Sequence, residues 1–213
     1  MARTLARRDR NMDAKRARIF EAAATLFSAH GYAGVTTQAV SGAADVAAGT
    51  LFRYAATKAD LLLMVYNLEF AAAIATGRES AAAKDDPSDA VFALVLPVLQ
   101  RNAEQPENAI HYQRELLFGH GPTLHRAEGL RLVQELEESV GAILVRAAGR
   151  DDAEVRVQAQ RASRLVFAGL HLALAQPSTH AHPEASPAGE LDAQVALVVR
   201  GFLDAVRLPT TRR

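Results

Sequence analysis

Side chains suited to hydrogen bonding with DNA gather between residues 36 and 58 of this 213-residue chain. The hydroxyls of Thr36 and Thr37 stand where a short helix would begin, so they can cap it and leave backbone N–H groups free to meet phosphate. Thr50 could bond to a base edge or a phosphate, and Lys58 could anchor a phosphate at a later helix start. The candidate DNA-contacting residues are Thr36, Thr37, Gln38, Ala47, Ala48, Gly49, Thr50, Phe52, Arg53, Tyr54 and Lys58.

Two short helices joined by a tight corner must position these groups. The first follows Thr36, the corner falls near Asp45, and the second covers about residues 48–54. Small residues at its start keep the second helix slim enough for a major groove, where Ala47 and Ala48 could touch thymine methyl groups. The apolar side chains that would lock the two helices together are Val40, Ala44, Val46 and Leu51. The arrangement is typical of a helix-turn-helix and predicts a DNA-binding protein.

A longer helix is predicted on each side of this motif. The preceding helix begins at a cap on Asn11 or Asp13 and ends at Gly31, a fitting residue for a helix C-terminus. Its inner face holds Ile19, Ala23, Leu26 and Phe27. After the motif, Thr57 and Asp60 resemble a capping box that opens a helix to about residue 75.

The whole chain is predicted to be all-α. Strand patterns are nearly absent, and apolar residues recur at helical spacing. Further helix starts are marked by Pro87, Pro106, Pro122 and Pro187. We expect Gly149 to end one helix, Asp151 or Asp152 to begin the next, and Pro177 to stop that one. A polar loop follows Pro177, and the tail from residue 209 is expected to be disordered.

The charges balance overall, with 24 basic and 24 acidic residues, but they are unevenly distributed. Residues 1–60 hold nine Lys/Arg against five Asp/Glu, and the remainder holds fifteen against nineteen. A basic head on an acidic body suits a polyanion-binding module joined to a domain that stays off DNA, although chance could give the same imbalance. The basic tail with Arg3, Arg7, Arg8 and Arg10 could reach the minor groove or phosphates, or could form a solvated terminus.

Several function classes lack their sequence signals. Cysteine is absent, and there is neither a secretory leader nor an apolar run of about 18 residues, so we expect a soluble, cytoplasmic protein. Phosphate-binding loops, dinucleotide fingerprints and nucleophile elbows are missing. The histidines His120, His125, His180 and His182 do not form a metal-site pattern. We therefore predict a protein that is not an enzyme and that has no cofactor and no metal.

The motif resembles the DNA-binding domain of the TetR family of bacterial repressors. That family's pattern runs from Arg-x-x-Ile through Phe, Gly-Tyr and Thr-Thr to Gly-Thr-Leu-Tyr, then Tyr-Phe and Ser-Lys. The matching positions here are Arg16, Ile19, Phe27, Gly31-Tyr32, Thr36-Thr37, Gly49-Thr50-Leu51-Phe52, Tyr54-Ala55 and Thr57-Lys58. Three positions depart, since Asp45 replaces the corner glycine, Ala47 the capping Ser or Thr, and Ala55 an aromatic residue. The missing cap costs about 1 kcal/mol of helix stability, so a less rigid motif is expected.

The resemblance implies a division of labour along the chain. It gives a helix-turn-helix DNA-binding domain over residues 1–57, a ligand-binding and dimerisation domain over 58–207, and a disordered tail over 208–213. It also implies a homodimer on a palindromic DNA operator and a small hydrophobic or amphipathic effector. The effector would change the spacing of the two heads through the helix that begins at Thr57. A repressor is the family's common form, and an activator or a nonspecific architectural DNA-binding protein is the alternative.

Two apolar stripes with small residues independently favour pairing of two chains through the last two long helices. The alternative is that both stripes pack within one chain. The first stripe holds Val155, Ala159, Ala162, Val166, Gly169, Leu170 and Ala173, and the second Leu191, Val195, Val198, Val199, Phe202 and Val206. The small residues that would allow close approach are Ala162, Gly169, Ala173, Ala196 and Gly201.

Aromatic and imidazole side chains on the body helices are the candidates for a ligand pocket. For each of them, packing in the core is the alternative. His111, Tyr112 and His171 are the best suited to act as polar handles, because a buried histidine needs a partner. The candidate ligand-binding residues are Tyr66, Phe70, Phe92, His111, Tyr112, Phe118, Phe167 and His171.

Overall fold

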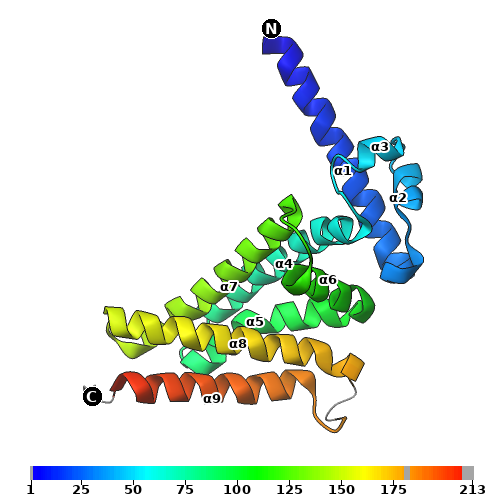
Figure 1. Cartoon of the computed structure of the whole chain (residues 1–213). Coiled ribbons are helices and arrows are strands. Elements are labelled where there is room, and N and C mark those ends of the chain that lie inside the picture. Colours follow the sequence, from blue (N-terminus) through cyan, green and yellow to red (C-terminus); the bar gives the residue numbers. More distant parts are fainter. Residues whose placement is uncertain (1, 180–182, 208–213) are drawn as a thin grey trace. The chain divides into compact units, whose positions relative to one another are not determined.

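The computed structural model describes residues 2–179 and 183–207, with side chains from residue 12 onward. Over these residues every regular element is an α-helix, which confirms the predicted all-α class. The helices are α1 (Ala2–Gly34), α2 (Thr37–Ala43), α3 (Ala48–Leu51), α4 (Lys58–Ala82), α5 (Pro87–Ala103), α6 (Pro106–Phe118), α7 (Leu124–Ala148), α8 (Ala153–Thr179) and α9 (Pro187–Arg207) (Figure 1). The predicted disordered tail, the side chains of the basic N-terminal residues, and His180 and His182 lie outside the described part.

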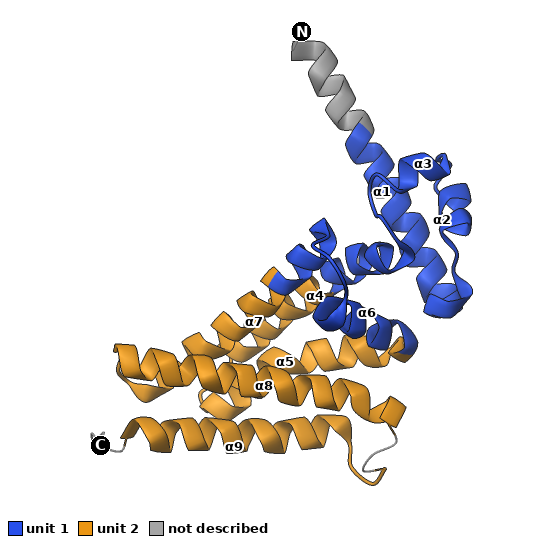
Figure 2. Cartoon of the chain, in the orientation of Figure 1, with its two compact units in different colours: residues 1–69, 107–130 blue, residues 70–106, 131–213 orange. Residues whose placement is uncertain are grey.

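The helices form two compact units (Figure 2). Unit 1 comprises residues 1–69 and 107–130, and unit 2 comprises residues 70–106 and 131–213. Unit 1 therefore contains α6 and the first residues of α7 in addition to the predicted helix-turn-helix. These units describe packing, and the predicted functional boundary between residues 57 and 58 stays a prediction.

In unit 1, α1 supplies one wall of the core. Ile19, Ala23 and Phe27 are fully buried at helical spacing, as predicted. The helix breaks at Gly31, whose φ of 67° lies in the left-handed region that glycine adopts without strain. Its start was predicted wrongly: α1 begins at Ala2 rather than at Asn11 or Asp13. The reason is that the Ala, Leu and Arg residues before Asn11 are strong helix formers and extend the helix.

The start of α4 uses the predicted capping residues. The Asp60 N–H donates to Thr57 Oγ1 over 3.0 Å, and the Ala56 N–H donates to Asp60 Oδ2 over 3.0 Å. Among the described helices, α4 is the one long and apolar enough to cross a membrane by length and composition. Of its most apolar stretch, 61% is buried inside the protein, as in the core helix of a soluble protein. This is weak evidence for a membrane span, and the cytoplasmic location stays a prediction.

In unit 2, α8 lies along α9, and both contact α5. Asp86 caps α5 by accepting from the N–H groups of Ser88 and Asp89 over 2.8 and 3.1 Å, as its position before Pro87 predicted. The predicted stop at Pro177 is wrong, because α8 continues to Thr179. A proline so near the helix end removes one N–H donor where few further intrahelical bonds remain to be made.

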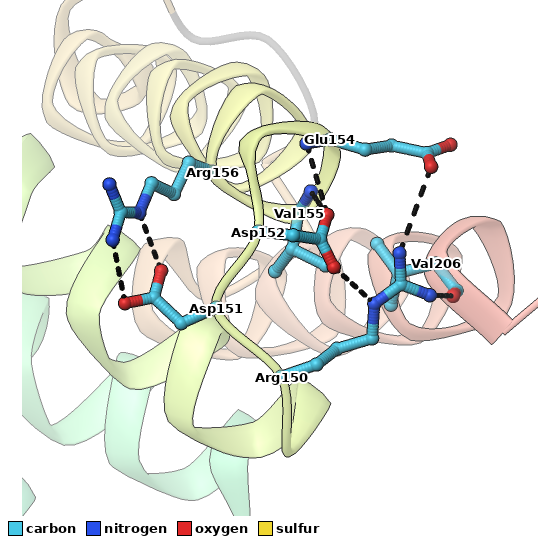
Figure 3. A network of polar contacts seen from close by, with 7 residues as sticks. All are labelled: Arg150, Asp151, Asp152, Glu154, Val155, Arg156 and Val206. Carbon is cyan, nitrogen blue, oxygen red and sulfur yellow. Dashed lines mark hydrogen bonds and ion pairs between the residues drawn. The ribbon is translucent and has the colours of Figure 1, made fainter.

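The corner between α7 and α8 is held by charged side chains (Figure 3). Gly149, with φ of 68°, ends α7 as predicted, and Asp152 caps α8 through the N–H groups of Glu154 and Val155. Arg150 donates to Asp152 Oδ2 over 2.6 Å and to the Val206 carbonyl of α9 over 3.2 Å. One arginine thus joins the start of α8 to the end of α9.

Candidate nucleic-acid interface

The first helix of the predicted motif, α2, begins at a side-chain cap. Thr36 has an extended backbone, and its Oγ1 accepts from the Ala39 N–H over 3.1 Å. Thr37 is half-buried in the first turn, and Gln38 beside it is exposed. The free N–H groups at this helix start carry the positive partial charge of the helix terminus, an arrangement that suits a phosphate.

The corner after α2 has the conformation expected for a helix-turn-helix but is built on an aspartate. Asp45 has φ of 50°, the one non-glycine residue with positive φ among the described residues. Its N–H bonds to the Gly42 carbonyl over 3.1 Å, and the Val46 N–H bonds to the Ser41 carbonyl over 3.0 Å. Arg18 of α1 lies 3.4 Å from the Asp45 carboxylate. Backbone bonds and this ion pair hold a conformation that aspartate tolerates less readily than glycine.

The second helix, α3, is short and presents a small exposed surface. Regular helix covers Ala48–Leu51, and further bonds from the Tyr54 and Ala55 N–H groups to the Leu51 carbonyl continue the turn, over 2.8 and 3.1 Å. Ala47 begins it without a side-chain cap, as predicted. Leu51 is buried against the core, so the opposite side of α3 is free to enter a groove of DNA. The exposed residues of this segment are Ala47, Ala48, Gly49, Phe52 and Arg53, with Thr50 half-buried.

Two of the predicted DNA contacts, Tyr54 and Lys58, have other partners in the structure. The Tyr54 hydroxyl donates to the Met12 carbonyl of α1 over 3.2 Å. The Lys58 ammonium donates to the carbonyls of Tyr32 and Val35 over 2.9 and 3.0 Å and lies 4.2 Å from the centroid of the Tyr32 ring. Lys58 thus satisfies carbonyls after the break in α1, a position where cations are favourable. A phosphate contact by either residue stays a prediction.

The first turn of α6 contacts the end of α1 through side chains that the sequence did not indicate. Glu107 accepts from the Ala33 N–H over 2.6 Å, and Asn108 donates to the Phe27 carbonyl over 2.9 Å. The His111 ring stacks on Tyr32 with centroids 4.1 Å apart. A Cβ on Gly31 would meet the Glu107 carboxylate, a flexible side-chain end that can shift, so it is the positive φ that favours glycine there. We name this contact of Glu107, Asn108 and His111 with α1 the α6 clamp.

The ligand-pocket candidates divide between the two units. Tyr66, His111, Tyr112 and Phe118 belong to unit 1, and Phe70, Phe92, Phe167 and His171 belong to unit 2. Phe118 is 75% exposed at the end of α6 and so lacks the burial expected of a pocket residue, and its assignment stays a prediction. Helical periodicity identified the segment but not the direction in which this ring points.

Burial shifts the acid–base behaviour of the three predicted polar handles. Burial raises the pKa of Tyr112, whose hydroxyl donates to Asn67 Oδ1 over 3.0 Å. Burial also lowers the pKa of His111. It lowers the pKa of His171 to about 4. The His171 ring meets Phe167 edge-on at 4.3 Å, and its Nδ1 has no hydrogen-bond partner among the described residues. His171 is therefore neutral near pH 7, with an unpaired ring nitrogen inside unit 2.

Cavities lined by the described residues of unit 2 include the following two. One of about 390 Å³ is mostly apolar and lies where α5, α8 and α9 meet, against Leu96, Leu99, Leu174, Pro177 and Pro187. The other, of about 330 Å³, lies along α8 and α9. Of the described residues that line them, none is one of the eight pocket candidates. The sequence missed this region because its lining is aliphatic, and aliphatic side chains carry no distinctive chemistry.

The predicted pairing stripes on α8 and α9 are largely buried inside unit 2, so their assignment to dimerisation is wrong. Val155, Val166, Leu191 and Val199 are no more than 2% exposed within one chain. A different face of the same helices is uncovered: Leu165 and Leu172 on α8 are 60% and 67% exposed, and Leu197 on α9 is 63% exposed. Besides its buried face, α8 therefore carries an exposed apolar face, and α9 carries one exposed leucine. The stripes predicted to pair two chains are the buried faces that build the monomer core.

Fold and motif together define an all-helical protein whose N-terminal helix-turn-helix is that of a DNA-binding transcriptional regulator. The family described as "Bacterial regulatory proteins, tetR family" matches residues 19–65, the segment that holds the end of α1, the motif and the start of α4. The N-terminal part of the chain is therefore similar to the DNA-binding domain of the TetR family. Members of this family regulate transcription by binding DNA and are not enzymes.

Solved structures of regulators share the fold along most of the chain. Thermus thermophilus FadR, a TetR-family repressor solved with lauroyl-CoA, is 25% identical with a TM-score of 0.65, covering 87% of this chain and 94% of that one. Bacillus subtilis FadR, solved with stearoyl-CoA, is 16% identical with a TM-score of 0.62, covering 86% and 97%. The TetR-family regulator PfmR, also from Thermus thermophilus, is 21% identical with a TM-score of 0.57, covering 86% and 97%. Among curated proteins, no sequence matches the chain.

Proposed function

We propose that the protein is a ligand-released transcriptional repressor that binds a palindromic operator as a homodimer. The observation that carries this proposal is the exposed face of α2 and α3, where a capped helix start and the small side chains of α3 stand clear of the core. Of the proposed contacts, Arg53 and Thr50 suit base edges or phosphates, and Ala47 and Ala48 suit thymine methyl groups. Phe52, which is 49% exposed, could contact the wall of the DNA groove.

Dimerisation is supported by the uncovered leucines of α8 and α9. A short α3 makes few contacts by itself, whereas two copies on successive major grooves can be specific. The occupant we propose for the face of Leu165, Leu172 and Leu197 is therefore a second copy of this chain. When exposed aliphatic residues on neighbouring helices form one patch, that patch is typical of a protein–protein contact.

The proposed effector is a small hydrophobic or amphipathic molecule bound in the body. Its support is the mostly apolar cavity of about 390 Å³ in unit 2, within the volume range of small-molecule sites. The complexes of the two FadR proteins with fatty acyl-CoA esters point to the same kind of molecule. Effector binding would weaken DNA binding through α4, with a coupling of about 1–3 kcal/mol.

A nonspecific architectural role is the second candidate, and the charges argue against it. The segment 47–54 carries one basic side chain, Arg53, and the Lys58 ammonium is bonded to carbonyls. Sequence-independent affinity depends on many phosphate contacts, which these residues do not supply.

The test is selection of duplexes from a random-sequence pool with the full chain, followed by gel-shift competition. We expect a palindromic sequence to be enriched, and unrelated DNA not to compete for it. Acyl-CoA esters of increasing chain length, added to the complex, are then expected to release the duplex. Equal competition by random DNA would overturn specific repression, and a complex that all esters leave intact would overturn the acyl effector alone.

A further inference from the structure

We propose that His125, in the first turn of α7, is a positioning residue for DNA binding. It holds in place the end of the DNA-reading segment, which runs from α2 through α3 to Tyr54. The proposal rests on the proposed role of α2 and α3 as the DNA-reading elements. It adds a residue 71 positions away from that segment, on a helix that has no part in the motif. All contacts that carry it lie within unit 1.

The His125 ring is 2% exposed, and its Nε2 lies 3.0 Å from the Tyr54 carbonyl oxygen. A carbonyl can only accept a hydrogen bond, so Nε2 carries the proton. The Tyr54 carbonyl follows the last turn of α3, where carbonyls have no partner within the helix. His125 therefore satisfies a backbone group that belongs to the reading segment.

Tyr54 is held at two places. Its hydroxyl donates to the Met12 carbonyl over 3.2 Å, and its own carbonyl accepts from His125. Its N–H bonds to the Leu51 carbonyl over 2.8 Å, which ties Tyr54 to the helical turn with Thr50 and Arg53. Because α3 is one short helix without a side-chain cap, these outside contacts fix its C-terminal end.

A buried hydrogen-bonded chain continues from His125 to two further helices. The Asn67 amide of α4 donates to the His125 carbonyl over 2.7 Å, and Tyr112 of α6 donates to Asn67 Oδ1 over 3.0 Å. Asn67 and Tyr112 are 4% and 5% exposed. On α7, a Cβ at Gly129 would lie 2.7 Å from Asn67 Oδ1, so a glycine is what lets α7 approach this closely.

This arrangement points to positioning because of what a polar chain costs in a core. Each buried polar group must be paired, and an apolar set of the same shape could stabilise the unit equally well. A hydrogen-bonded polar chain instead selects one relative position of α4, α6, α7 and the reading segment. Movement of α6 or α7 would lengthen the His125 bond and loosen α3, so the junction can convey a change in those helices to the DNA-reading face.

The experiment uses the full chain with His125→Phe, which removes the donor, and His125→Gln, whose side-chain N–H can replace Nε2–H. His120→Phe and His120→Gln make the same exchanges at an exposed imidazole in the loop before α7. Affinity is measured for the duplex selected by the wild-type chain, and hydrogen exchange is followed at the backbone amides. We expect H125F to bind about tenfold more weakly and H125Q to stay within about threefold of wild type, with both His120 variants unchanged.

Hydrogen exchange separates positioning from general loss of stability. With H125F, exchange is expected to rise at Tyr54 and Ala55 while the buried amides of α1 stay protected. Wild-type affinity of H125F would overturn the proposal, as would an even rise across unit 1 with no rescue by H125Q.

If H125F does not fold, Tyr112→Phe is tested in its place. This variant removes one hydroxyl at the far end of the hydrogen-bonded chain that begins at His125. The expected result is then a smaller loss of affinity with the same local rise in exchange, and no local rise would overturn the proposal. If the wild-type chain selects no duplex, the proposed function fails. The exchange pattern of H125F still shows whether His125 holds the end of the DNA-reading segment in place.

Discussion

The two compact units hold their helices together in different ways. In unit 1, side chains bond to backbone groups of neighbouring elements, as Asn108, Lys58 and His125 do with the carbonyls of Phe27, Tyr32 and Tyr54. In unit 2, α5, α8 and α9 meet mainly through aliphatic side chains, and polar contacts between helices come from exposed arginines, as Arg150 makes with Val206 in Figure 3 and Arg78 with Ser139. Directional bonds fix the orientation of helices, whereas aliphatic contacts allow small sliding movements. A DNA-reading motif needs the first property and a body that responds to a ligand needs the second.

The largest effect is expected from charging the uncovered face of unit 2. Leu165→Asp with Leu197→Asp places a carboxylate on each of α8 and α9, where a dimer would have to bury it without a partner. We expect light scattering to show a monomer and affinity for the selected duplex to fall by about 100-fold, because two linked heads bind far more tightly than one.

Leu124→Asp is the matched control, since Leu124 is 75% exposed at the start of α7 in unit 1. It should leave mass and affinity unchanged. A double variant that remains dimeric would show that the second copy binds to another face.

The second prediction concerns the buried side-chain amide of Asn108 in the α6 clamp. Asn108 is fully buried, and Asn108→Leu keeps its approximate volume while leaving the Phe27 carbonyl without its donor. We expect the free energy of unfolding, measured with urea, to fall by about 2 kcal/mol.

The half-buried Asn102 of unit 2, whose amide bonds to the Val98 carbonyl of its own helix, provides the comparison. Asn102→Leu should change stability by less than half as much. An N108L protein as stable as wild type would mean that aliphatic packing suffices in unit 1 too, and the contrast between the units would disappear.

The sequence predicted those parts of the fold that depend on local chemistry. The cap at Thr36, the corner at Asp45, the break at Gly31 and the Asp86 cap each follow from the preferences of one or two residues, and the structure has all four. Contacts between distant segments could not be predicted in this way. Nothing at Asn108 indicates that its partner lies 81 residues earlier.

The errors on α8 have a related physical cause. Apolar residues on this helix occupy two faces, and periodicity alone does not say whether a given face meets the same chain or another. Val166 was assigned to pairing but is buried in the monomer, whereas Leu165, one residue earlier, is exposed. The choice between adjacent positions is made by the packing of α5 and α9, which is a property of the tertiary structure.

A smaller effect, in the stabilising direction, is expected at the start of α3. Ala47 has the extended backbone of a cap residue but no oxygen to offer, so Ala47→Ser should accept from the Gly49 or Thr50 N–H. We expect a gain of about 1 kcal/mol in the free energy of unfolding and slower hydrogen exchange in α3. Ala48→Ser adds the same hydroxyl one position later, inside the helix, and should give no gain. Equal effects of the two serines would show that α3 is limited by its outside contacts rather than by its missing cap.

The smallest effect is expected at the exposed corner of unit 2, in acid. Hydrogen bonds from Arg150 and from the N–H groups of α8 lower the pKa of Asp152 to about 2. Because the folded-state pKa is below the unfolded value of about 3.9, the carboxylate stabilises the fold above pH 4, and this contribution is lost as the pH falls toward 2. Asp152→Asn should therefore flatten the fall in stability between pH 4 and pH 2 in urea titrations, and Asp85→Asn, at an exposed loop aspartate, should not. If both variants followed the wild-type curve, this corner would add nothing to the acid sensitivity of unit 2.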